Sequence, residues 1–137
     1  MGTVPQAGAI PWRRMEGGDG GWKLQILTIT STRGNWIFPK GMIDPGDSSK
    51  ETAIKELEEE AGFTGRISGP AVGAYRYSKW GLELEVTMYP VEVTGAAEVW
   101  EEAGHRQLFW GAPERVRDKL HKPELRELLD RFLAERL

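Results

Sequence analysis

Residues 41–63 read GMIDPGDSSKETAIKELEEEAGF, and this stretch decides the fold because it marks both ends of one helix. Ser48 and Glu51 fit the S-x-x-E capping box, in which two side chains satisfy backbone N–H groups at a helix start. Gly62 fits the left-handed position that commonly follows the last helical turn. We therefore predict a helix over residues 48–62.

Three glutamates lie on one face of this predicted helix, apart from its apolar stripe. Glu56, Glu59 and Glu60 are spaced i, i+3 and i+4, which brings their Cβ atoms to within about 5–6 Å of one another. Their charges repel, and a bound divalent cation would turn that repulsion into attraction. The spacing is typical of a magnesium site, but a solvated face with ion pairs such as Lys55 with Glu59 would explain the same residues.

The segment before the helix is rich in glycine and proline. This composition predicts a shaped loop without regular structure over residues 33–47. Metal sites often recruit a backbone carbonyl, and phosphates often meet backbone N–H groups, at turns of this kind. The loop therefore favours the metal-site interpretation of the glutamates.

The rest of the chain predicts a sheet and two more helices. Apolar and β-branched residues predict strands at residues 6–13, 22–31, 71–77, 82–93 and 105–110. Prolines suited to a first turn predict helices at residues 113–120 and 123–137. Pro90 is expected at a sheet edge or a bulge, and Trp22 is expected in the core.

Composition limits the function classes. A length of 137 residues with 39% hydrophobic content suits one domain, residues 1–137. The formal net charge of -3 gives no overall basic field for DNA or an anionic membrane, and the lack of cysteine excludes thiolate chemistry. No apolar run approaches the ~18 residues of a membrane span, and residues 1–10 do not resemble a signal peptide. We expect a cytoplasmic protein.

The opening stretch resembles the Nudix box, G-x5-E-x7-R-E-U-x-E-E-x-G-U, where U is a bulky apolar residue. The matching positions are Gly41, Glu56, Leu57, Glu59, Glu60, Gly62 and Phe63. Asp47 stands where the family has glutamate, and Lys55 where it has arginine. In the family this pair is understood to support the metal-binding glutamates; Asp47 and Lys55 keep the charges but lose the bidentate fork.

The resemblance implies an α/β protein with the Nudix-type α/β/α sandwich around a central mixed β-sheet. It implies a Mg²⁺-dependent pyrophosphohydrolase, with Mn²⁺ as a substitute. Glu56 and Glu60 would be the leading metal ligands, Glu59 a ligand or the general base, and the Gly41 carbonyl a further ligand. Alternatively, the base lies outside the box, with Glu101 or Glu102 as the candidate and Glu83 and Glu85 ranked behind them.

Four further segments are similar to the diphosphoinositol polyphosphate phosphohydrolase-like (DIPP-like) branch: residues 7–13, 36–41, 99–104 and 121–123. That branch holds a highly phosphorylated ligand with basic side chains. The corresponding residues here are Arg13, Arg14, Arg33, Lys40, Arg106 and Lys122. Gln6 and residues 81–83 replace basic positions of the branch.

Several partner predictions follow from this resemblance and from the composition and last helix of the chain. The expected substrate is a phosphorylated small molecule: a diphosphoinositol polyphosphate, a dinucleoside polyphosphate or another nucleoside diphosphate-X. An RNA 5′-end is a less favoured partner, no DNA or membrane partner is expected, and the last helix would suit a homodimer. A Nudix-like sensor that binds a nucleotide without turnover is the alternative function.

Overall fold

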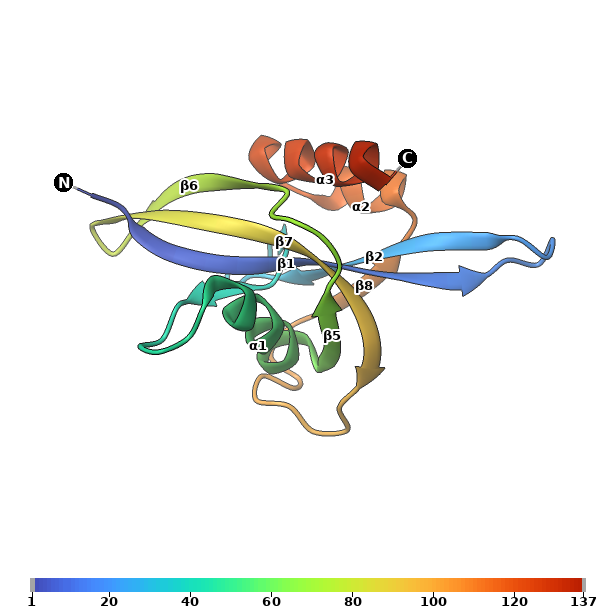
Figure 1. Cartoon of the computed structure of the whole chain (residues 1–137), viewed down its shortest axis with the longest axis horizontal. Helices are drawn as coiled ribbons and strands as arrows, with labels where there is room; N and C mark the ends of the chain where they lie inside the picture. The colour runs from blue at the N-terminus through green and yellow to red at the C-terminus, as the bar shows by residue number, and fades with distance from the viewer. Residues whose placement is uncertain (1, 137) are drawn as a thin grey trace.

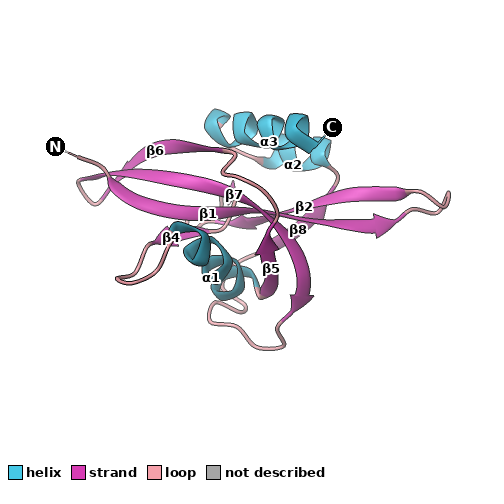
Figure 2. Cartoon of the chain, viewed as in Figure 1, coloured by secondary structure: helices cyan, strands magenta, loops and turns pink. Residues whose placement is uncertain are grey.

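A computed structural model describes residues 2–136 and shows a mixed β-sheet with helices on both faces (Figure 1). The strands are β1 (Val4–Glu16), β2 (Trp22–Thr30), β3 (Trp36–Ile37), β4 (Lys40–Met42), β5 (Phe63–Ile67), β6 (Gly73–Lys79), β7 (Leu82–Ala96) and β8 (Leu108–Gly111). The helices are α1 (Ser49–Ala61), α2 (Pro113–Lys119) and α3 (Pro123–Arg136). Helix α1 lies on one face of the sheet, and α2 and α3 lie on the other (Figure 2). The predicted α/β/α sandwich is confirmed.

The sheet is mixed because its two long central strands run parallel. β1 pairs with β7 in parallel, from Val4 opposite Leu84 to Trp12 opposite Glu92. β2 and β4 pair with β1 in antiparallel fashion, as β5 and β6 do with β7. The β1–β2 hairpin projects beyond the helices as a two-stranded ribbon (Figure 1).

The prediction that Pro90 marks an edge or a bulge is wrong. Pro90 lies opposite Ile10 within the central strand β7. On the other side of β7 the neighbour changes at this point, since Met88 pairs with Gly73 of β6 while Val91 pairs with Ile67 of β5. A residue without an N–H group is tolerated where one neighbouring strand ends and the next has not begun.

The segment at residues 33–47 is more regular than predicted. Its residues 36–37 pair with β2, and residues 40–42 pair with β1. β5 was not predicted, and residues 105–107, which were predicted as part of a strand, lie outside it, because β8 begins only at Leu108. These short strands depend on partners distant in the sequence, so local pattern carries little signal for them.

Both predicted ends of α1 are confirmed. The Ser48 hydroxyl accepts a hydrogen bond from the Glu51 backbone N–H (3.1 Å), and the Glu51 carboxylate accepts one from the Ser48 N–H (2.9 Å). Gly62 ends the helix with φ 77°, in the left-handed region. The capping box therefore fixes where the glutamate-bearing turns begin.

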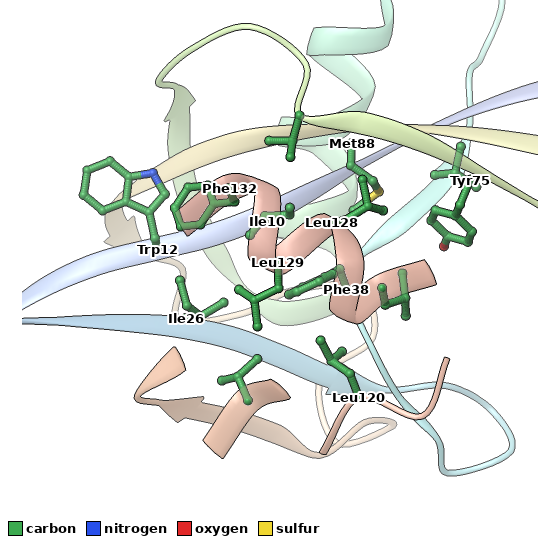
Figure 3. Close-up of a cluster of buried hydrophobic side chains, with 14 residues drawn as sticks. Ile10, Trp12, Ile26, Phe38, Tyr75, Met88, Leu120, Leu128, Leu129 and Phe132 are labelled. Carbon is green, nitrogen blue, oxygen red and sulfur yellow. The ribbon is translucent and has the colours of Figure 1, made fainter. Parts of the chain in front are cut away.

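Two apolar clusters hold the helices to the sheet. Ile10, Phe38 and Phe132 belong to the cluster under α2 and α3, which Figure 3 shows in close-up. Leu27 and Leu57 belong to the cluster under α1. Trp22 is 72% exposed, so its predicted burial is wrong: it lies on the projecting ribbon, beyond residues 26–29, where β2 pairs with β8. None of the helices in residues 2–136 is long and apolar enough to cross a membrane.

Candidate active site

Gly41 brings β4 into close contact with α1. It pairs with Ala7 of β1, and cross-strand partners share a face of the sheet, so Gly41 faces α1. A Cβ atom added at Gly41 would overlap the carboxyl group of Glu56. Only glycine allows this approach, which places the Gly41 backbone beside Glu56 as the two predicted metal ligands require. The ligand role of the Gly41 carbonyl stays a prediction.

Glu60 is buried, with a relative exposure of 5%. Its carboxylate accepts a hydrogen bond from the Lys40 backbone N–H (3.0 Å) and another from Nη2 of Arg106 (3.2 Å). These two contacts join the start of β4 and the loop at residues 97–107 to the last turn of α1. The side chain of Glu60 is therefore held in place before any ligand arrives.

Arg106 contacts three acceptors of the protein. Besides Glu60, its Nε donates to Glu102 (2.9 Å) and its Nη1 donates to the Thr30 carbonyl (2.8 Å). Its side chain is 13% exposed. Arg106 thus lies beside the glutamates and is engaged with two of their carboxylates; its predicted phosphate contact stays a prediction.

Glu102 lies next to this group because its loop docks on α1. The Glu102 backbone N–H donates to the carbonyl of Glu59 (2.9 Å), and the Glu102 side chain is 34% exposed, so water reaches it. The other candidate bases have different surroundings. Glu83 accepts a hydrogen bond from Ser78. Glu85 accepts one from Arg76 on the neighbouring strand.

Burial and crowding perturb the glutamates. Burial raises the pKa of Glu56 to about 8, and the neighbouring carboxylates of Glu60 and Glu59 add to the effect. Burial also raises the pKa of Glu60 to about 7, against the opposing effect of the Arg106 guanidinium. Carboxylates crowded in this way gain from a nearby cation, and perturbed pKa values are frequent at functional sites.

The residues present fit a hard divalent cation in their chemistry. The predicted ligands are carboxylates and a backbone carbonyl, the oxygen donors that Mg²⁺ and Mn²⁺ prefer. As the side chains stand in residues 2–136, no three acids or histidines form a metal-binding group. Glu60 in particular uses both its oxygens for Lys40 and Arg106, so a cation would share or replace those contacts.

The predicted supporting pair, Asp47 with Lys55, is present but weak. Lys55 Nζ donates to Asp44 at 2.7 Å and to Asp47 at 3.4 Å. The side chains of Lys55 and Asp44 are 43% and 60% exposed, and ion pairs exposed to this degree contribute little to stability. The role of this pair in supporting the metal ligands stays a prediction, and Asp44 is a partner that the sequence did not indicate.

Two of the predicted phosphate-binding residues meet at Tyr77. The ammonium groups of Lys40 and Lys122 lie 4.7 and 4.8 Å from the centre of its ring. Lys40 also donates to the Tyr77 hydroxyl (2.9 Å), which donates to Gln6 (2.7 Å). Sequence reasoning missed Tyr77, since nothing near it in β6 signals a contact with β4 or with the segment that joins α2 to α3.

Arg13, another of the predicted basic residues, lies apart from this cluster. Its guanidinium lies 3.9 Å from the centre of the Trp110 ring and donates to Gln25. Arg13 is six residues along β1 from Ala7, the partner of Gly41, and six residues of strand span about 20 Å. Arg33 is exposed on the turn between β2 and β3. The structure therefore places Arg106 and the backbone of Lys40 against Glu60, places Lys122 with Lys40 at Tyr77, and leaves Arg13 elsewhere.

Comparison with known proteins identifies the family. The NUDIX domain model matches residues 9–132. Nudix hydrolase 17, mitochondrial, of Arabidopsis thaliana is 31% identical over 95% of this chain and 73% of its own length. A putative 8-oxo-dGTP diphosphatase of Bacillus subtilis (strain 168) is 30% identical over 59% of this chain and 52% of its own.

Solved structures agree on the fold. The crystal structure of the C. elegans Ap4A hydrolase superposes with a TM-score of 0.80 at 23% identity, and the match covers 98% of this chain and 99% of that one. The hydrolase relatives agree with the enzyme class expected from the resemblance to the Nudix box. The chain belongs to the Nudix family of hydrolases.

Proposed function

We propose that this chain is a divalent-metal-dependent pyrophosphohydrolase that cleaves a diphosphate linkage in a substrate with several consecutive phosphates, with a dinucleoside polyphosphate as the leading substrate. The observation that carries this proposal is the position of Lys40, whose backbone N–H donates to Glu60 of α1 while its ammonium group lies with that of Lys122 against Tyr77. A chain of phosphates needs positive groups on one side and a cation held by carboxylates on the other.

Magnesium is the proposed cation, with Glu56, Glu59, Glu60 and the Gly41 carbonyl as its ligands. When bound there, it would neutralise charge on the phosphoryl oxygens and favour deprotonation of the attacking water. The oxygen-only donor set and the raised pKa values of Glu56 and Glu60 support this assignment.

The protein's own residues supply the remaining steps. Lys40 and Lys122 would hold the phosphates by charge, and the Tyr77 hydroxyl keeps the Lys40 ammonium in position. Glu102, which is partly exposed and tied to α1 through its backbone, is proposed to take the proton from the attacking water. Glu59, in the last turn of α1, is the second candidate for that role.

A substrate panel tests the proposal. Purified protein is incubated with Mg²⁺ and, in separate reactions, with diadenosine polyphosphates, diphosphoinositol polyphosphates, 8-oxo-dGTP and triphosphorylated RNA, and phosphate products are followed. Diphosphoinositol substrates represent the DIPP-like branch. We expect fastest turnover of a dinucleoside polyphosphate and none without a divalent cation.

Two results would contradict parts of the proposal. Binding of a panel member with Mg²⁺ but without products would establish the sensor alternative. Preferred turnover of a diphosphoinositol polyphosphate or an RNA end would leave the reaction type intact and replace the substrate. The double variant Lys40→Gln/Lys122→Gln tests the proposed phosphate-binding role of the two lysines. It should raise KM for polyphosphates while metal binding stays near the wild-type value.

A further inference from the structure

Arg106 joins three parts of the chain that are far apart in sequence. Its guanidinium donates to Glu60 on α1, to the carbonyl of Thr30 at the end of β2, and to Glu102 in its own loop. Each of its three nitrogens makes one of these contacts. The planar fork therefore fixes two carboxylates at a set angle to each other and to the sheet.

The surroundings make these contacts strong. The side chains of Arg106 and Glu60 are only 13% and 7% exposed. Guanidinium–carboxylate hydrogen bonds shielded from water are less screened than exposed pairs, and their geometry is better defined. By contrast, Lys55 pairs with Asp44 and Asp47 where its side chain is 43% exposed and has no fork.

A second contact supports the same coupling. The Glu102 backbone donates to the carbonyl of Glu59, so the loop is attached to α1 by its main chain as well as through Arg106. Main-chain attachment sets where the loop lies, and the guanidinium then sets where the Glu102 and Glu60 side chains point. Both carboxylates have roles in the proposed reaction.

We propose that Arg106 is a positioning residue, which orients the metal-ligand carboxylate of Glu60 and the carboxylate of Glu102 relative to each other. The inference rests on the proposed function for the roles of these two acids. It assigns to Arg106 a supporting role in which one planar guanidinium bridges two carboxylates, a geometry that Lys55, in place of an arginine, cannot give. A phosphate-binding arginine would act on the substrate; Arg106 acts on the residues that bind metal and move the proton.

Metal binding in the absence of substrate tests this role directly. The dissociation constant for Mn²⁺ is measured by electron paramagnetic resonance for the wild type, Arg106→Gln, Arg106→Lys and Arg117→Gln. Arg117 is the control, because it also donates three hydrogen bonds, in its case all to the carboxylate of Asp130, between α2 and α3 on the other face of the sheet. kcat and KM at saturating Mn²⁺ are measured for the same proteins.

We expect Arg106→Gln to weaken Mn²⁺ binding by about 10–100-fold, as loss of a residue that orients a metal ligand typically does. Arg106→Lys, which keeps the charge without the fork, should fall between it and the wild type, and Arg117→Gln should match the wild type. kcat should fall in the order of the Mn²⁺ affinities, with KM changed less than about threefold.

Several outcomes would overturn the inference. One is wild-type Mn²⁺ affinity in Arg106→Gln, or in Arg106→Lys should the glutamine variant fail to fold. Another is a rise in KM alone, which would assign Arg106 to the substrate phosphates. If the wild type binds Mn²⁺ but hydrolyses no panel substrate, the proposed function fails while the Mn²⁺ affinities still decide whether Arg106 orients Glu60.

Discussion

At Gly41 the backbone of β4 lies against the side chain of Glu56, a proposed metal ligand. An added Cβ would overlap the Glu56 carboxyl group, so Gly41→Ala must push β4 and α1 apart or turn Glu56 away. We predict at least a tenfold loss of turnover and a free energy of unfolding lower by about 1–3 kcal/mol, the usual cost of overpacking. Steady-state kinetics and urea unfolding measure the two effects.

Gly18→Ala is the matched control for this change. No heavy atom lies within 4 Å of a Cβ built at Gly18, and the residue is exposed in the β1–β2 turn. Its rate and stability should equal those of the wild type. A Gly41→Ala protein with wild-type turnover would show that Glu56 is not held where the reaction needs it.

Glu60 has a structural role as well as its proposed ligand role. Replacing it with glutamine leaves one amide NH₂ group facing the N–H donors of Lys40 and Arg106. We expect Glu60→Gln to lower the free energy of unfolding by about 1–3 kcal/mol. Turnover should fall by more than about 100-fold, beyond the loss seen when only a supporting residue is removed.

Glu58→Gln controls for a loss of charge on the same helix, because Glu58 is exposed. It should leave both quantities near their wild-type values. If Glu60→Gln were as stable and as active as Glu58→Gln, Glu60 would be neither a buried acceptor nor a ligand.

The residues of the site were predictable to different degrees for a physical reason. Helical spacing alone groups Glu56, Glu59 and Glu60, because neighbours on a helix are fixed by local geometry. The burial of Glu60 depends on residues 97–107, about forty positions later, and no local pattern reports it. Tyr77 was missed for the same reason.

At the scale of elements, α1 is the best-specified part of the fold. Its start follows from the side chains of Ser48 and Glu51, and its end from the backbone freedom of Gly62. β3 and β4 carry two and three residues, and each exists only by pairing with β2 or β1. A loop prediction from glycine and proline was therefore correct for the flanks of this segment and wrong for residues 36–37 and 40–42.

Removing the cap of α1 tests whether the stability of the helix can be lowered without a loss of turnover. Ser48→Ala loses the acceptor for the Glu51 N–H, and we predict a loss of about 1 kcal/mol in the free energy of unfolding. Turnover at a temperature where the variant is folded should stay near wild type, because Glu56 lies two turns further along α1. Urea unfolding and steady-state kinetics measure these quantities.

Ser48→Asp restores an acceptor at the same position and should recover most of the lost stability. Equal stability of Ser48→Ala and the wild type would mean that packing of Leu57 and its neighbours against the sheet determines the helix by itself. A large loss of turnover in both variants would instead show that the first turn of α1 contacts the substrate.

At the scale of the whole molecule, strand β4 connects the glutamates of α1 with the two lysines at Tyr77. β4 directs Gly41 toward α1 and Lys40 toward Tyr77 and Lys122, because successive residues of a strand point to opposite faces. The family resemblance predicted the sandwich, but the contact of β4 with β6 and with the α2–α3 connection is set by the topology of the sheet. The repulsion among the glutamates of α1 should lower the stability of the entire fold.

The stability of the metal-free protein should fall as pH rises through neutrality. The pKa values of Glu56 and Glu60 are raised from an ordinary value of 4.5 to about 8 and about 7. Between these limits the folded state binds more protons than the unfolded state, so the free energy of unfolding decreases with rising pH, and the loss is complete above about pH 8. Melting temperatures in a chelator, recorded from about pH 5 to pH 9, follow this decrease.

A divalent cation should reverse the trend, because it binds the ionised carboxylates of the folded state and competes with protons. The rise in melting temperature on adding Mg²⁺ should therefore be larger at high pH than at low pH. Glu56→Gln should flatten the profile in chelator and reduce the Mg²⁺ effect, whereas Glu58→Gln should leave both unchanged. A Mg²⁺ effect of equal size at every pH would mean that the cation stabilises the fold somewhere other than at these glutamates.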